Sequence, residues 1–151
     1  MVKLILLVHV LAGATWFGAH VYIEGLMASA SRTRDSETIM RVGLRVAQTN
    51  RRVLVGAGAI TIIFGAWIVF VSVYTFEMLF VAVGLAVSIL GLALSLFIFN
   101  PKVDEIEAIV AERGLTDPEA LAKMKSLGHV RHATTLLLTT AMVLMVLQPG
   151  A

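Results

Sequence analysis

The chain has 151 residues, of which 58% are hydrophobic and only 15% are charged. A water-soluble domain carries about a quarter charged residues, so this composition predicts an integral membrane protein. The absence of cysteine excludes disulfides, thiolate metal sites and cysteine-ligated iron–sulfur clusters. The net charge of +2 is small, and clustered basic residues suit a membrane surface better than nucleic acid. We therefore expect the lipid bilayer, and no nucleic acid, as a partner.

Four apolar stretches are long enough to cross a bilayer, which takes roughly 20 helical residues. They cover about 2–27, 52–73, 76–99 and 127–148. The apolar runs are continuous rather than alternating, which excludes a β-barrel. The first run is too long for a signal peptide, so we expect it to be retained as a helix. The prediction is all-α, an integral membrane four-helix bundle that forms a single transmembrane domain over 1–151.

The connections between these stretches differ in charge. The connection 28–51 is rich in arginine, and a tight turn is expected near Tyr74 and Thr75. The connection 100–126 has helical spacing with a turn near 114–118, where Asp117 is the predicted N-cap before Pro118. By the positive-inside rule, 28–51 and 100–126 are cytoplasmic loops and both termini lie outside. We expect a multi-pass protein of the cell's inner (cytoplasmic) membrane.

The first stretch carries ionisable groups on one helical face. At 100° per residue this face reads His9, Gly13, Trp16, His20, Glu24, Met27. Ionisable side chains within a span usually face the bundle interior, so we expect this stripe to line the core. A histidine in such a position also has a simpler interpretation, a hydrogen bond to a neighbouring helix, and Glu24 can equally extend to the inner interface.

The fourth stretch offers partners at matching depths. Measured from the outer end, His20 lies about 27 Å deep, His132 about 24 Å and His129 about 28 Å. Near the other surface, His9 lies about 10 Å deep and Met142 about 9 Å. The sequence therefore predicts an inner His/His level and an outer His/Met level, with Trp16 between them.

Two imidazoles, or an imidazole and a thioether, are known axial ligands of haem iron. The preferred interpretation is b-type haem with a redox or electron-transfer role, held by His20 with His132 or His129, or by His9 with Met142. Haem propionates would seek cations near the inner interface, where Arg51, Arg52 and Arg131 fall. No sequence motif identifies a redox partner or a substrate.

Two other functions remain open. Imidazole and thioether also suit copper, so His9, Met142 and Met145 form a candidate copper-binding or copper-transport site. Alternatively, the histidines only bridge helices in a structural or accessory subunit without a cofactor. No hydrolase motif or phosphate loop is present in the sequence. A homodimer is plausible because four helices make a narrow bundle.

The run HVLAGATWFGAHVY, with His9, Trp16 and Gly18, resembles the first helix of a superfamily of small membrane proteins. It includes the CopD-type copper-resistance membrane domain, the HemJ-type protoporphyrinogen oxidase and a family of uncharacterised integral membrane proteins of about this length. Similarity to the last extends over nearly the whole chain, including Thr61 and Gly65 in RRVLVGAGAITIIFGAWIV and the ending MVLQPG. The resemblance implies a four-helix membrane fold and, through the HemJ-type members, b-type haem bound by His9. The chain departs from the HemJ pattern after Trp16, where YIEGLM replaces Pro-Arg, which argues against porphyrinogen oxidation.

Overall fold

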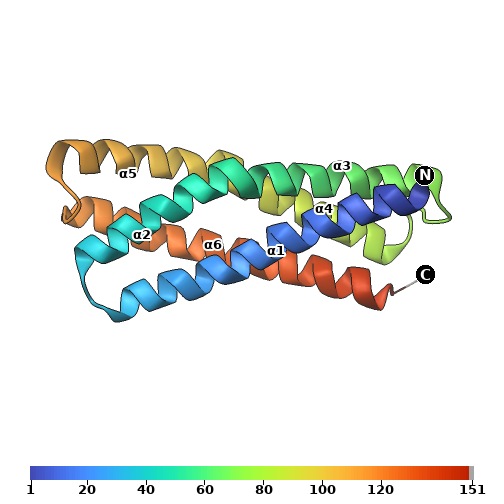
Figure 1. Ribbon diagram of the computed structural model, residues 1–151, viewed down its shortest axis with the longest axis horizontal. Coiled ribbons are helices and arrows are strands. Elements are labelled where there is room, and N and C mark those ends of the chain that lie inside the picture. Colours follow the sequence, from blue (N-terminus) through green and yellow to red (C-terminus); the bar gives the residue numbers. More distant parts are fainter. Residues whose placement is uncertain (150–151) are drawn as a thin grey trace.

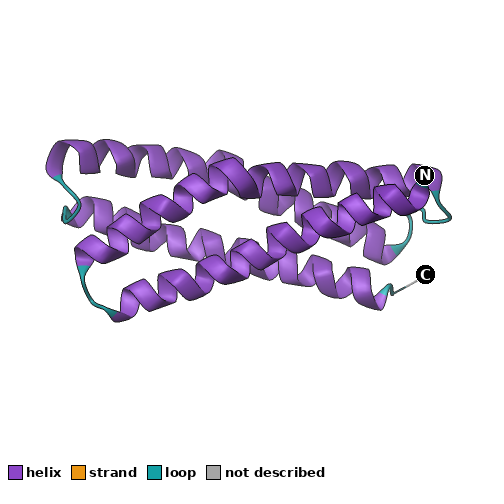
Figure 2. Cartoon of the chain, in the orientation of Figure 1, coloured by secondary structure: helices purple, strands orange, loops and turns teal. Residues whose placement is uncertain are grey.

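The computed structural model describes residues 1–149, and its regular structure over them is entirely helical (Figures 1 and 2). The helices are α1 (Val2–Arg32), α2 (Ser36–Thr49), α3 (Val55–Val71), α4 (Leu79–Leu94), α5 (Asn100–Arg113) and α6 (Pro118–Leu147). A π-helical turn, η1 (Asn50–Leu54), joins α2 to α3, and a second, η2 (Ser95–Phe99), joins α4 to α5. The chain thus forms four long helices, which confirms the predicted all-α four-helix architecture.

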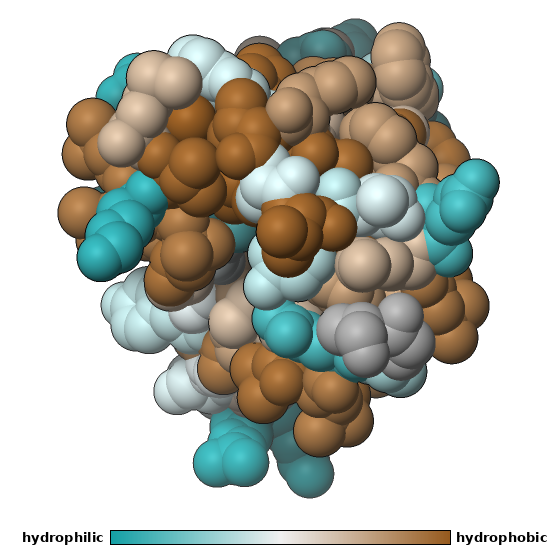
Figure 3. Space-filling model, turned by 90° about the vertical axis from the view of Figure 1, so that its right-hand side faces the viewer, coloured by the Kyte–Doolittle hydropathy of each residue, from teal (hydrophilic) through white to brown (hydrophobic). Residues whose placement is uncertain are grey.

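All four long helices are apolar enough to cross a membrane. Within the described residues these candidate spans are Val2–Arg32, Ser36–Val71, Leu79–Arg113 and Pro118–Leu147. Short turns make chain neighbours antiparallel, so both termini lie at one end of the bundle (Figure 1). Seen from that end, hydrophobic residues cover most of the outside and hydrophilic residues are scattered (Figure 3). The four apolar spans indicate a multi-pass membrane protein.

The segment 100–126 is helical on both sides of a short turn, as its spacing predicts, and the segment 28–51, which was predicted only as a loop, is also helical over most of its length. Helix α1 runs on to Arg32, and only short connections remain around 33–35 and 114–117. The helix Ser36–Val71 has 36 residues and is about 54 Å long at 1.5 Å per residue, whereas a bilayer core is about 30 Å thick. One end of the bundle therefore extends well beyond the apolar layer.

Apolar side chains at helical spacing explain why this charged end folds. The buried cluster of the charged end comprises Met40, Ala47, Phe99, Val103, Ile106, Ala120, Met124 and Leu127. Their charged neighbours point to solvent, so a hydropathy average conceals an amphipathic helix. Gly43 in α2 permits the closest approach, because a Cβ there would lie 2.6 Å from the Met124 sulfur.

Helix caps set the ends of this region. The Asp117 carboxylate accepts hydrogen bonds from the backbone N–H groups of Glu119 (2.9 Å) and Ala120 (3.0 Å), which confirms the predicted N-cap of α6. Asp35 caps α2 in the same way, and hydrogen bonds from Thr38, its hydroxyl first, lower the pKa of the Asp35 carboxyl. Gly114 ends α5 with φ +93°, a conformation that favours glycine.

Candidate functional site

The polar face of α1 lies where its spacing predicts. Trp16, His20 and Met27 are buried, and His9 and Glu24 are half-buried. Polar side chains at this depth face protein rather than lipid. The stripe therefore lines the interior of the bundle, and it meets two cavities of very different size.

The larger cavity, which we call the outer chamber, lies in the half of the bundle that carries the termini. Its volume is about 440 Å³, within the usual range of ligand and cofactor sites. Side chains from α1, α3, α4 and α6 line it, and most of them are apolar. His9 and Trp16 line it from α1, and Met142 and Met145 from α6. The structure thus brings His9 and both methionines to the wall of one chamber.

His9 is held in one tautomer by the neighbouring helix. Its Nδ1 lies 2.8 Å from the backbone carbonyl oxygen of Thr61 in α3. A carbonyl only accepts, so Nδ1 carries a proton, and in the neutral ring Nε2 then keeps its lone pair. This is the form of imidazole that binds a metal, with the second nitrogen oriented by a backbone carbonyl.

A glycine makes room for the His9 ring. A Cβ on Gly65 would lie 2.8 Å from His9 Cε1 and 3.1 Å from Nδ1, so only glycine fits against the ring as it stands. Gly58, about two turns earlier on the same face of α3, does the same for Trp16, whose Cε2 would lie 2.8 Å from such a Cβ. By contrast, Gly56 has no atom within 4 Å of its Cβ position.

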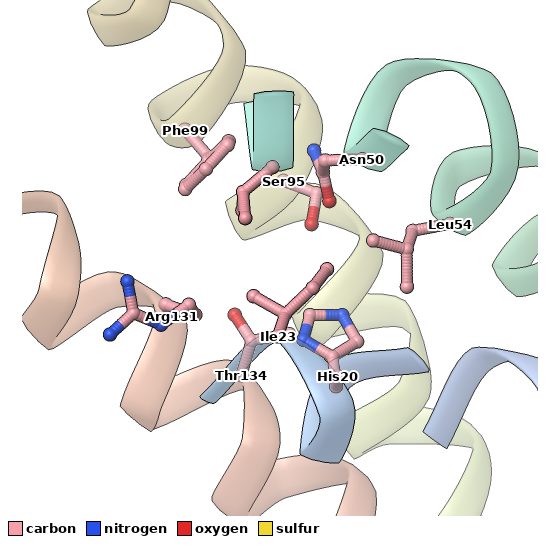
Figure 4. Close-up of a pocket in the computed structure, with 9 residues that line it drawn as sticks. His20, Ile23, Asn50, Leu54, Ser95, Phe99, Arg131 and Thr134 are labelled. Atoms are coloured by element: carbon pink, nitrogen blue, oxygen red, sulfur yellow. The ribbon is translucent and has the colours of Figure 1, made fainter. Parts of the chain in front are cut away.

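The smaller cavity, which we call the His20 chamber, has a volume of about 10 Å³. His20 is 4% exposed, and neither of its ring nitrogens has a hydrogen-bond partner among the described residues. Figure 4 shows the ring facing the Asn50 amide and the Ser95 hydroxyl, with the Thr134 hydroxyl beside it. The Trp16 ring stands edge-on to the imidazole, 6.5 Å away between centroids. Trp16 also lines the outer chamber, so its ring lies between that chamber and the His20 imidazole.

Glu24 is the centre of an ionic cluster between α1 and α6. Its carboxylate lies 3.1 Å from Arg131 Nε and 2.9 Å from His132 Nδ1, and it accepts a hydrogen bond of 3.3 Å from the Thr135 hydroxyl. The Arg131 contact is an ion pair that is misaligned for a hydrogen bond. Glu24 is only 19% exposed. It therefore does more than extend to the interface, since it joins two helices.

The predicted pairing of His20 with His132 is corrected by this cluster. The His132 side chain is 61% exposed and turns toward Glu24, so the structure does not bring it to His20. The buried face of α6 carries Leu127, Thr134, Leu138 and Ala141 instead. Depth along a helix was estimated from the sequence, but rotation about the helix axis decides which side chain faces inward, and burial of Thr134, Leu138 and Ala141 sets it.

The other candidate residues lie apart from both chambers or already have partners. His129 and Arg52 are exposed. Arg51 donates to the Asn100 carbonyl at 3.2 Å and pairs with Asp104 and Glu107, and Arg131 pairs with Glu24. Over residues 1–149, no group of three or more His, Cys, Asp or Glu side chains is arranged to hold a metal ion.

Several residues of these sites were missed in the sequence. Asn50, Ser95 and Thr134 are buried polar side chains that line the His20 chamber. Ser95 stands alone in the apolar run LALSLFIF, and that isolation was a usable signal. The acceptor of the His9 hydrogen bond is the backbone carbonyl of Thr61, which no pattern of side chains in the sequence can predict. Searches of protein-family models, curated proteins and solved structures found no match to the chain.

Proposed function

We propose that this protein binds b-type haem in the outer chamber, with His9 as an iron ligand and with a redox or electron-transfer role in the membrane. The main support is the position and hydrogen bond of His9. An imidazole whose Nδ1–H is donated to the Thr61 carbonyl stands at the wall of an apolar chamber of about 440 Å³. His9 is also the residue implied by the resemblance of the first helix to HemJ-type proteins.

The donor set of the chamber fits this cofactor. His9 Nε2 keeps the lone pair that an iron ligand needs. The thioethers of Met142 and Met145 are the candidate second ligands, because His/Met ligation is a known haem arrangement. The apolar walls suit a macrocycle, and Ser72, Tyr74 and Gln148 provide polar groups toward the termini. Arg51, Arg52 and Arg131 are not among the residues that line this chamber, so they are not the propionate partners that the sequence indicated.

The residues of the chain have separate tasks in this proposal. Haem iron, when bound, supplies one-electron redox chemistry. The Thr61 carbonyl orients the His9 ring and makes its Nε2 a more basic ligand for a metal. Gly65 lets the ring lie against α3, and Trp16 closes the chamber toward His20. The apolar walls exclude water, which affects a redox potential through the local dielectric.

We further propose that the charged end of the bundle is cytoplasmic and that both termini lie outside, in the cell's inner membrane. The support is the concentration of Lys and Arg in the segments 28–51 and 100–126, according to the positive-inside rule. The outer chamber then lies in the external half of the protein.

The test is the visible spectrum of detergent-purified protein after expression with ample haem. We expect a Soret band that shifts on reduction, and we expect His9→Ala to lose most of it. His129→Ala is the matched control, because His129 is exposed and its removal should leave the band intact. A colourless wild-type protein, or an unchanged band in His9→Ala, would contradict the proposal.

Copper is the second candidate, since Met142 and Met145 share the chamber with His9 and thioethers suit Cu(I). Stoichiometric copper in the purified protein, with weaker binding in Met142→Leu and no Soret band, would favour it. A protein without colour or metal would favour an accessory subunit in which the histidines only join helices.

A further inference from the structure

The two π-helical turns of the protein meet at the His20 chamber. Asn50 and Leu54 come from η1, and Ser95 and Phe99 come from η2, and all four line this cavity. A π turn is rare and occurs frequently at functional sites. Here two of them, in different long helices, present a polar side chain to the same small space (Figure 4).

His20 lacks the partners that a buried imidazole needs. A neutral ring has one N–H donor and one nitrogen acceptor. Neither nitrogen of His20 is hydrogen-bonded to a described residue, although the residue is only 4% exposed. Buried polar groups in native proteins are normally paired with protein or with ordered water. We therefore expect a hydrogen-bonding ligand at the ring that the described residues do not supply.

The size and the polar lining of the His20 chamber suit a single water molecule. Its volume of about 10 Å³ is close to the least space that holds one water, which also needs two to four polar partners. Asn50 Nδ2 donates to Asn100 Oδ1 at 3.1 Å, so Asn50 Oδ1 remains as an acceptor. The Thr134 hydroxyl donates to the Val130 carbonyl at 3.0 Å and keeps lone pairs, and the Ser95 hydroxyl also lines the space.

A polar path leads from this chamber to the charged end of the bundle. It runs through the Asn50–Asn100 hydrogen bond to Arg51, which donates to the Asn100 carbonyl and pairs with Asp104 and Glu107. The Asp104 side chain is 66% exposed. Toward the outer chamber, the Trp16 ring stands edge-on to the His20 ring. A chain of polar contacts thus connects the His20 chamber to the charged end of the bundle.

The charged groups near the ring come from two helices. Glu24 lies one turn along α1, and Arg131 reaches the chamber from α6 while its guanidinium points away from the ring (Figure 4). These two side chains are paired with each other. The η1 and η2 turns contribute Asn50 and Ser95, which do not titrate in the physiological range.

We propose that His20 is a proton-exchange site, in which one bound water links the imidazole to the charged end of the protein. In the exchange, a ring N–H proton passes to the water oxygen and a proton from that water returns to the ring, so the charge and the atom count of both are unchanged. The site lies on the opposite side of Trp16 from the outer chamber and does not depend on haem binding.

Water-edited solid-state nuclear magnetic resonance of ¹⁵N-histidine-labelled protein in lipid bilayers tests the proposal. Four histidines give few signals, and His20→Gln and His129→Gln assign two of them. We expect magnetisation to pass from water to the His20 ring nitrogens in wild-type protein, despite their burial. Transfer to exposed His129 is the internal reference. If His129 receives magnetisation and His20 does not, the proposal is overturned.

Two variants locate the water. Thr134→Val, nearly equal in size, and Asn50→Leu remove a polar partner, and we expect each to reduce transfer to His20 at least threefold while transfer to His129 stays constant. Unchanged transfer to His20 in both variants would overturn the assigned position of the water. A colourless protein would contradict the haem proposal but would leave this result unaffected.

Discussion

The two ends of the bundle solve the packing of four helices in different ways. At the charged end, eight buried side chains from Met40 to Leu127 fill the interior. At the end that carries the termini, the long helices leave a partly open cavity of about 440 Å³ between them. A protein interior is normally close-packed, so a large apolar chamber is a feature that needs an occupant or a purpose, whereas the packed end serves as a scaffold.

His9 and His20 express the same contrast on one helix face. His9 borders the large chamber and has its Nδ1 bonded to a backbone carbonyl at 2.8 Å. His20 borders a space of about 10 Å³ and has neither nitrogen bonded. An oriented ring beside a large apolar space suits a cofactor, and an unpartnered ring beside a water-sized polar space suits a water. The two histidines lie on one face of α1, but their surroundings suit them to different ligands.

Removing the wall between the two chambers should have the largest effect. Trp16 is 2% exposed, lines the outer chamber and stands edge-on to the His20 ring. We expect Trp16→Ala to lower the free energy of unfolding by about 3–5 kcal/mol, as for other buried aromatic truncations, and to join the His20 chamber to the outer chamber. Denaturant unfolding in detergent measures the loss.

Trp67→Ala is the matched control for this variant. Trp67 is 45% exposed on α3 and stacks on Phe64 with centroids 5.7 Å apart, so its truncation should cost less. Equal losses in the two variants would mean that Trp16 is no more than a surface contact, and the division into two sites would fail.

Breaking the ionic cluster below His20 should have the next largest effect. Glu24→Gln leaves the Arg131 guanidinium, 12% exposed, without its counter-charge. Loss of one partner from a buried pair costs about 3 kcal/mol or more. We therefore expect a clearly lower midpoint of thermal unfolding for Glu24→Gln in detergent.

Glu37→Gln is the control for that change, because Glu37 pairs with Arg41 on the surface of α2. Exposed pairs at this spacing contribute only about 0.3–0.5 kcal/mol. If the two glutamate variants unfold at the same temperature, the Glu24 cluster does not join α1 to α6.

Crowding the His9 ring should have the smallest effect on stability and a specific effect on the outer chamber. A Cβ in Gly65→Ala would meet His9 Cε1 at 2.8 Å, so the ring must move and its bond to the Thr61 carbonyl is strained. Overpacking of this kind costs about 1–3 kcal/mol. We expect the haem absorbance of Gly65→Ala to fall or shift, as measured by titration with haem.

Gly56→Ala is the matched control on the same helix. No atom lies within 4 Å of its Cβ position, and alanine is favoured over glycine within a helix by about 0.5–1 kcal/mol. We expect it to keep both its stability and its haem titration. An equal effect of the two substitutions on haem would mean that the His9 ring is not held by α3.

Most of the fold could be predicted from local patterns. The apolar runs marked four helices, and the spacing of α1 placed Trp16 and His20 inward, because one helix repeats every 3.6 residues whatever surrounds it. The Asp117 cap was predictable for the same reason, since Asp before Pro is a local signal. The helical extension into 28–51 was obscured because its charged face lowered the average hydropathy, whereas the spacing of 100–126 indicated its helices.

The sites were less predictable because they depend on how helices rotate against each other. Hydropathy and periodicity by themselves determined the four spans, the inward face of α1 and the place of His9 and His20 on it. Only the tertiary structure decided that His132 turns to Glu24, that the Thr61 carbonyl orients His9 and that two π turns bring Asn50 and Ser95 to His20. The reason is physical: position along a helix is a property of the chain, whereas rotation, cavity size and backbone acceptors arise when side chains of different helices compete for the same interior.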